Sequence, residues 1–179
     1  MHARATLRGA VRVRGTAAIT LRGLTVEGGG IALRNVDRYV LDRLRVSGSE
    51  AAGIDVHRSR GGTITRVLAR DNHGAGIAIG GSQPRVRAVR TFVREVTVRS
   101  NTVGIVLDGS RATTVSRARI LDNSMGVSVK DATDLVLRDN DIRSSGVGVA
   151  LSGGSNLRIA GNRLVSNATD VLVIHPPES

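Results

Sequence analysis

The chain has 179 residues, a formal net charge of +11 and no cysteine, so a disulfide framework and a thiolate metal site are excluded. Its aromatic residues are Tyr39 and Phe92 alone, so Val, Ile, Leu, Ala and Gly must fill the interior, which suits a narrow and regular core. The sequence holds no apolar run long enough to span a membrane, and its start lacks the apolar segment of a signal peptide.

The excess positive charge lies in the N-terminal half. Residues 1–100 hold 18 Arg and 7 acidic residues, whereas residues 101–179 hold eight basic and eight acidic residues. This excess fits an Arg-rich solvated surface or a polyanionic partner, such as an acidic polysaccharide, a nucleic acid or a membrane surface. Nucleic acid is disfavoured, because single-strand binders stack bases on aromatic side chains, which this chain nearly lacks.

A unit of about 22 residues repeats along the chain. Each unit opens with a β-branched residue, and a second apolar residue follows two positions later, which predicts a short strand. The openers are Val11, Ile31, Ile54, Ile77, Ile105, Val127, Val149 and Val171. Apolar residues ten and fifteen positions after most openers predict two more strands in each unit. In the long fourth unit, Val93 and Val98 take these places.

This repeat predicts an all-β fold, a single-stranded right-handed parallel β-helix (solenoid) of about seven coils with roughly 22 residues each. We expect one domain over residues 1–179, with residues 1–10 as an irregular N-terminal cap and residues 171–179 as the last strand and tail. A bare terminal coil is an open sheet edge. The ends therefore predict that the chain is part of a larger protein or that it associates end to end with another copy.

Small residues recur at the turns. Glycine precedes six openers, which predicts a turn that needs a positive φ or has no room for a Cβ. Three or four residues before these glycines stand small polar residues, which we expect to stack and bond to one another along the helix. They are Ser49, Asn72, Asn101, Asn123 and Ser145, with Asn167 in the matching place before Asp170. The excess length of the fourth unit predicts a protruding basic loop with Arg85, Arg87 and Arg90, which is either a solvated loop or a substrate flap.

Coils stacked in phase would bring polar residues together on the outer side of the first strands. Asp55 and His57, in Gly53-Ile54-Asp55-Val56-His57, point outward from one strand. The third residue after each opener forms an outward row that includes Arg14, Arg34, His57, Gly80, Asp108 and Lys130. His57 could act as a general acid or base near neutral pH, with Asp55 orienting it or sharing the proton transfer.

The guanidinium group of arginine binds a carboxylate through two parallel hydrogen bonds, so Arg14 and Arg34 could hold sugar carboxylates. The other residues predicted to bind substrate are Asp108, Lys130, Arg85 and Arg87. The matching reaction removes the proton α to a uronate carboxylate. Re-protonation from the other face gives epimerisation, and loss of the 4-linked sugar gives a lyase. The alternative is that Asp55 and His57 are solvated surface residues. Asp55, His57 and Asp108 span too many coils for a set of metal ligands, so neither a metal nor another cofactor is expected.

The segments Gly-Ile-Asp-Val-His, Arg-Asp-Asn-His-Gly-Ala-Gly-Ile and Asp-Asn-x-x-Gly-Val resemble the β-helix of bacterial mannuronan C5-epimerases and, more broadly, carbohydrate-binding β-helix repeats. The resemblance covers roughly residues 30–170. The Asp-Pro-His motif of the epimerase groove stands here as Asp55-Val56-His57, so the resemblance implies catalytic roles for Asp55 and His57. It also implies an acidic polysaccharide as partner and a periplasmic or extracellular location. The alternative function is a non-catalytic β-helix module that binds glycan or protein, or a structural spacer.

Overall fold

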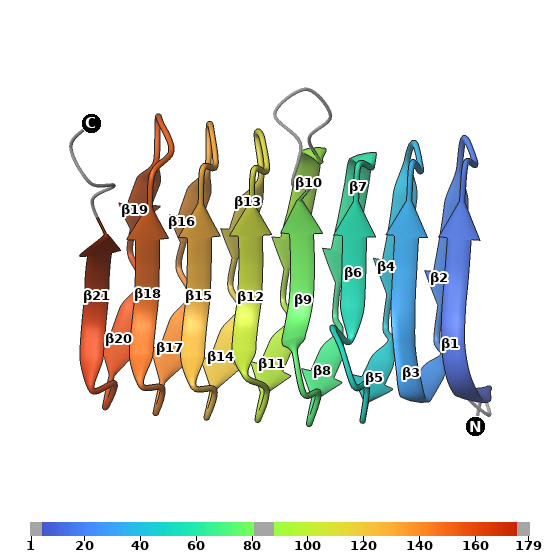
Figure 1. Ribbon diagram of the computed structural model, residues 1–179, viewed down its shortest axis with the longest axis horizontal. Helices are drawn as coiled ribbons and strands as arrows, with labels where there is room; N and C mark the ends of the chain where they lie inside the picture. The colour runs from blue at the N-terminus through green and yellow to red at the C-terminus, as the bar shows by residue number, and fades with distance from the viewer. Residues whose placement is uncertain (1–4, 81–87, 175–179) are drawn as a thin grey trace.

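The computed structural model describes residues 5–80 and 88–174, and the regular elements in these ranges are all β-strands. The strands wind into a parallel solenoid of about seven coils, with the N-terminal coil at one end of the stack and the C-terminal coil at the other (Figure 1). Partner residues in the C-terminal half are 22 positions apart, as in the series Ile105, Val127, Val149 and Val171. The predicted fold class is therefore confirmed.

The strands form three walls, named here the first, second and third face. The first face holds the C-terminal halves of β1 (Thr6–Arg14) and β3 (Thr25–Arg34), followed by β6 (Ile54–His57), β9 (Ala75–Gly80), β12 (Val103–Asp108), β15 (Met125–Lys130), β18 (Val147–Ser152) and β21 (Thr169–Ile174). The second face holds β2 (Ile19–Arg22), β4 (Tyr39–Asp42), β7 (Arg60–Thr65), β10 (Val89–Arg94), β13 (Thr114–Ser116), β16 (Val136–Arg138) and β19 (Arg158–Ala160). The third face holds the N-terminal halves of β1 and β3, followed by β5 (Arg45–Ser47), β8 (Leu68–Arg70), β11 (Thr97–Arg99), β14 (Arg119–Leu121), β17 (Asp141–Arg143) and β20 (Arg163–Val165).

The long strand β3 joins two of these faces. Its residues 25–27 pair with β5 on the third face, and its residues 31–34 pair with β6 on the first face. As a result, the first and third faces form one 14-stranded sheet, and the second face is a separate sheet of seven strands. Between the two halves of β3, a Cβ on Gly29 would lie 2.3 Å from the backbone nitrogen of Ala10, so the bend requires glycine there.

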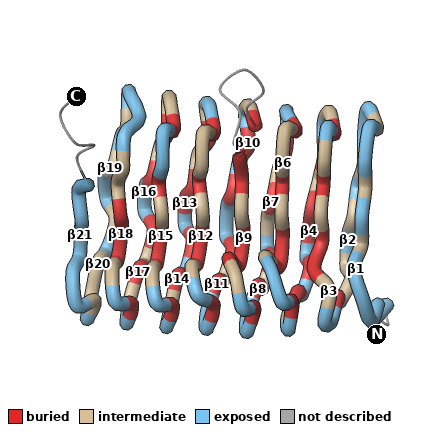
Figure 2. Tube along the Cα trace, in the orientation of Figure 1, coloured by how far each residue is buried: buried red, intermediate tan, exposed pale blue. Residues whose placement is uncertain are grey.

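The inward columns of the structure are the aliphatic columns that the repeat predicts. The eight openers occupy equivalent positions on consecutive strands of the first face. From Ile31 to Val149 these openers are buried, and the columns of the second and third faces meet them in one continuous core. Figure 2 shows this buried interior along the middle coils and more exposed positions in the first and last coils. Each fully buried Ile, Leu or Val contributes roughly 1.5–3 kcal/mol, so stability accumulates coil by coil.

The predicted polar stack is present beside the first face. The Nδ2 group of Asn72 donates to Oδ1 of Asn101 at 2.8 Å, and Nδ2 of Asn101 donates to Oδ1 of Asn123 at 3.1 Å. The backbone amides of Asn72 and Asn101 donate to the same two side-chain oxygens. A second stack, which the sequence reading missed, links Asn140 to Asn162 at 2.9 Å at the corner between the second and third faces.

The glycines that precede the openers are needed mainly for space. Gly30 has a positive φ of 71°, but the other five do not. A Cβ on Gly126 would lie 2.5 Å from the carbonyl oxygen of Gly148 in the next coil, and Gly104 and Gly148 are similarly crowded. Of the two predicted reasons for these glycines, the lack of room for a Cβ therefore applies at all six positions, and the positive φ applies at Gly30 as well.

Tyr39 fills the interior of the second face. Its side chain is 1% exposed, and its hydroxyl lies 2.7 Å from Oγ1 of Thr91, two coils further along. Gly62 occupies the coil between them, where a Cβ would lie 1.8 Å from the Cζ atom of the tyrosine ring. Burial raises the pKa of the Tyr39 hydroxyl well above its ordinary value, despite the opposing effect of the bond to Thr91. The ring thus takes the space that a side chain on Gly62 would fill.

The ends of the chain differ in part from expectation. Residues 6–10, expected in an irregular cap, form the start of β1, where Thr6 to Gly9 pair with β3 and continue the ladder of the third face. Arg90, expected in the basic loop, lies in β10, whereas Arg85 and Arg87 lie outside the described residues. In β21, Val171, Leu172, Val173 and Ile174 are exposed, and end-to-end association through this coil stays a prediction.

Candidate functional site

The predicted outward row lies on the first face with the expected order. Backbone pairing places Arg14, Arg34, His57, Gly80, Asp108 and Lys130 side by side on six consecutive strands. Neighbouring members are about 4.8 Å apart at the backbone. The row therefore crosses the coils as one line of charged and polar groups, interrupted at Gly80.

Asp55 pairs with the arginine of the preceding coil. The distance between Nη2 of Arg34 and Oδ2 of Asp55 is 2.9 Å, and both side chains are partly exposed. Asp55 and His57 extend outward from the same strand, as predicted, but the carboxylate contacts Arg34 instead of orienting the imidazole. A partly exposed ion pair of this kind contributes up to about 1 kcal/mol to stability.

His57 is partly buried, with Arg34 on one side of it in the row and Gly80 on the other. Burial lowers the pKa of its imidazole, and the positive charges of Arg34 and Arg58 lower it further, while Asp55 opposes them. Because its pKa is lowered, the imidazole is mostly neutral at pH 7, with a nitrogen able to accept a proton.

A small depression lies beside these residues. It has a volume of about 190 Å³ and is lined by Asp55, His57, Ala78, Ile79, Gly80, Val106 and Asp108. Gly80 lines it, and residue 80 has no room for a side chain, since a Cβ there would lie 2.0 Å from the carbonyl oxygen of Asp108. Pockets for small molecules usually measure about 300–1,000 Å³, so this depression could hold part of one sugar unit rather than enclose a whole ligand.

The other residues of the predicted substrate-binding set differ in where they lie relative to the depression. Asp108 borders the depression, whereas Arg14 and Lys130 are exposed and extend the row beyond Arg34 and Asp108 respectively. Arg85 and Arg87 lie outside the described residues.

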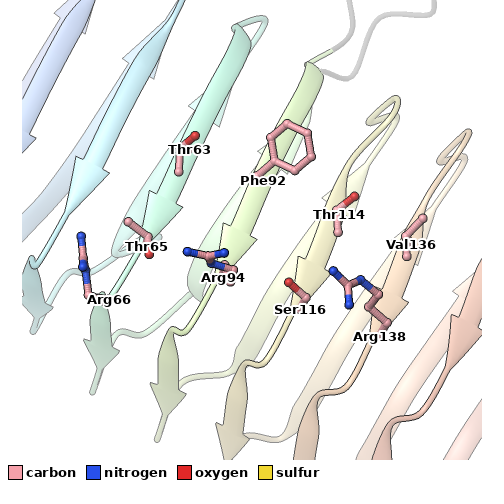
Figure 3. A pocket seen from close by; sticks show the side chains of 9 residues that line it. All are labelled: Thr63, Thr65, Arg66, Phe92, Arg94, Thr114, Ser116, Val136 and Arg138. Carbon is pink, nitrogen blue, oxygen red and sulfur yellow. The ribbon is translucent and has the colours of Figure 1, made fainter.

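A second hollow, which the sequence reading missed, lies on the second face. It has a volume of about 480 Å³, and Figure 3 shows Phe92 and three arginines among the side chains around it. The outward positions of the second-face strands could have predicted this hollow. At these positions Phe92, the single phenylalanine of the chain, stands between Thr63 and Thr114.

A comparison with models of protein families identifies the family of the chain. A family model described as periplasmic copper-binding protein (NosD) matches residues 10–176. The chain belongs to the NosD family. A comparison with curated protein sequences found no match.

Solved structures similar to this NosD-family chain include alginate-modifying enzymes. A mutant of the periplasmic alginate epimerase AlgG superposes with a TM-score of 0.72 at 19% identity, covering 81% of this chain and 35% of AlgG. The A-module of the Azotobacter vinelandii mannuronan C-5 epimerase AlgE4 gives a TM-score of 0.61 at 19% identity, covering 93% and 59%. For the AlgE6 A-module the TM-score is 0.61 at 14% identity, with coverage of 93% and 65%.

These comparisons confirm the resemblance to epimerase β-helices, and at such identities they show the fold alone. The chain spans about one third to two thirds of the length of these structures. Within residues 5–80 and 88–174, no helix is long and apolar enough to cross a membrane.

The copper in the family description does not fit the described part of this NosD-family chain. No group of three or more His, Cys, Asp or Glu side chains is placed there to hold a metal ion. The chain has no cysteine, and Met125 is its single methionine within the described residues. Copper prefers imidazole and soft sulfur ligands, and His57 and His73 lie on different parts of the coil, with His73 bound to Glu50.

Proposed function

We propose that the first face binds an acidic polysaccharide and that His57 removes a proton from a bound uronate. The observation that carries the proposal is the register, which puts three cationic side chains, an imidazole and a small depression in one row. A linear polymer laid across the coils would contact all of them.

Binding would rest on the cations of the row. Arg14 and Lys130 are exposed, and Arg34 is bound to Asp55 through one nitrogen. The remaining nitrogens of the Arg34 guanidinium are available for a sugar carboxylate. A polymer with a carboxylate on each unit could engage these side chains together.

The chemistry would begin at the carbon next to the uronate carboxylate. The C5–H bond breaks, its proton moves to the neutral imidazole of His57, and the electron pair spreads into the carboxylate, where Arg34 stabilises the added negative charge. Return of a solvent proton to the opposite side of C5 gives the epimer, and the protonated imidazole of His57 releases its proton to the solvent, which restores the neutral base. Tyr39 is not the proton donor in this scheme, because its hydroxyl is buried inside the solenoid against Thr91.

The comparisons support this proposal in general terms. The similar structures are alginate and mannuronan epimerases, and both the NosD family and AlgG are described as periplasmic. We infer that this chain meets exported polysaccharide in the periplasm.

Deuterium incorporation tests the chemistry. Polymannuronate incubated with the protein in heavy water should gain deuterium at C5, read by NMR of the polymer. His57→Ala should abolish the exchange, whereas His73→Ala, which changes an exposed histidine outside the row, should not. Absence of exchange with polymannuronate, polyguluronate and polygalacturonate would remove the epimerase proposal.

A non-catalytic binding module is the second candidate, and it is favoured by the existing pairing of Asp55 with Arg34 and by the small size of the depression. In that case retention on alginate resin persists without exchange, falls as salt is raised, and weakens in Arg34→Ala. Arg45→Ala is the matched control, because Arg45 is exposed on the third face. Equal retention of both variants would argue against binding at the first face.

A further inference from the structure

Phe92 lies on the outside of the solenoid. Its side chain is 54% exposed, and backbone pairing sets it between Thr63 of the preceding coil and Thr114 of the next. Figure 3 shows its ring standing on the outer face of β10, between these two threonines. The ring packs against no core residue on this side, so it offers an apolar surface to a ligand.

Cationic side chains lie beside this ring. Arg94 follows Phe92 two positions along β10, on the same side of the strand and roughly 6.6 Å away at the backbone. In the same row stand Ser116 and then Arg138, on the two following coils. Arg94 lies 3.4 Å from Glu95, and Arg138 lies 3.0 Å from Asp139, but both guanidinium groups stay about half exposed.

The hollow of about 480 Å³ is bordered by Phe92, Arg94, Arg138, Arg66 and a set of hydroxyl residues. Among the described residues that line it there is no acidic side chain. Apolar ring, hydroxyl groups and cations thus meet in one open cavity whose size is in the range of small-ligand sites.

We propose that this hollow on the second face binds a uronic-acid oligosaccharide, with one sugar ring stacked on Phe92 and a carboxylate held by Arg94 or Arg138. The apolar side of a pyranose ring suits a flat aromatic surface. Guanidinium groups match a carboxylate through paired hydrogen bonds. The hydroxyls of Thr63, Thr114 and Ser116 both donate and accept, as do the hydroxyl groups of a sugar.

The same features favour a sugar over a nucleic acid. Nucleic-acid strands are held by several stacking platforms in series, and this hollow has one. The two outward neighbours of Phe92 are threonines, which can bond to sugar hydroxyls but offer no stacking surface to a base.

The site is independent of the first face. It lies on a different wall of the solenoid and uses none of the residues of the first-face row. It would hold whether or not His57 is catalytic, and it would let one long polymer contact two walls of the same molecule.

The single phenylalanine provides a local reporter. Protein labelled with 4-fluorophenylalanine should give one ¹⁹F signal, from position 92, and the signal should shift on titration with a polymannuronate hexamer. A neutral hexamer of similar length, cellohexaose, should shift it much less. Arg34→Ala should leave the titration unchanged, which separates this site from the first face.

Calorimetry on variants measures the contacts. Phe92→Ala and Arg94→Ala should each weaken the binding of the hexamer at this site roughly tenfold or more. Arg158→Ala is the matched control, because Arg158 is exposed in the same outward column as Phe92 but three coils away, and it should have little effect. To isolate the second face, the measurements use a background with Arg34→Ala.

Three results would overturn the proposal. They are an unmoved ¹⁹F signal at saturating hexamer, equal shifts with charged and neutral hexamers, and a shift produced only by single-stranded oligonucleotides. Unchanged thermal unfolding of Phe92→Ala would confirm that a loss of binding comes from the site and not from the fold.

Discussion

The packing of Tyr39 against Gly62 makes a quantitative prediction about the interior of the solenoid. The ring of Tyr39 lies where a Cβ on residue 62 would stand, at 1.8 Å from Cζ and 2.2 Å from both Cε atoms. Ordinary contact begins near 3.4 Å. The variant Gly62→Ala must therefore displace a ring that is buried and hydrogen-bonded to Thr91.

The expected energies follow from this geometry. Gly62→Ala should cost about 3 kcal/mol, at the upper end for overpacking of a core. Tyr39→Leu should cost about 3–4 kcal/mol, because it opens a cavity and leaves the hydroxyl of Thr91 without its partner. In the double variant, the shorter leucine leaves room for the new methyl group, which fills part of the cavity. The double variant should be no less stable than Tyr39→Leu alone, so the two changes couple by about 3 kcal/mol.

Urea unfolding followed by far-ultraviolet circular dichroism measures this cycle, with the slope of the transition checked for constancy across the four proteins. Additive effects, with the double variant about 6–7 kcal/mol less stable than the wild type, would refute the proposed contact. A small effect of Gly62→Ala alone would refute it as well.

Three further predictions concern the polar groups. Asn123→Ala, which removes a buried amide that bonds to Asn101 and to two carbonyl groups, should lower the free energy of unfolding by about 2–4 kcal/mol. Arg158→Ala at an exposed position should change it by less than about 1 kcal/mol in the same urea assay. The pKa of His57, followed by NMR of the imidazole, should lie below 6.5 and should rise in Arg34→Ala. Because the folded protein binds this proton more weakly than the unfolded chain, the free energy of unfolding should fall as the pH drops below 6.5 and should level off below the pKa of the folded state. Asp42→Asn, which breaks the pairing of a carboxylate 1% exposed with two arginines, should lower the unfolding free energy by about 2–4 kcal/mol, and an unchanged transition would contradict that pairing.

The positions of Arg34, Asp55 and His57 on one face were predictable, but their contacts were not. The alternation of apolar and polar residues places Asp55 and His57 outside, and the repeat length places Arg34 beside His57. The pairing of Asp55 with Arg34 was not predictable, since it depends on how a long side chain bends across two coils. The hollow around Phe92 was missed for a related reason: its members come from several coils of the second face, and they form a cavity only when the side chains are packed.

The amino-acid sequence by itself determined the coil, its length and the inward columns. Apolar residues at every second position within a strand, repeated about every 22 residues, specify which side chains face the core. Apart from the asparagine stack, only the tertiary structure decided how side chains meet between coils. It placed the ring of Tyr39 over Gly62 and joined the first and third faces through β3. It also showed that the glycines before the openers have no room for a Cβ because atoms of the next coil lie too close. These contacts depend on the direction and reach of each side chain in three dimensions, which a pattern of residue types along the chain does not specify.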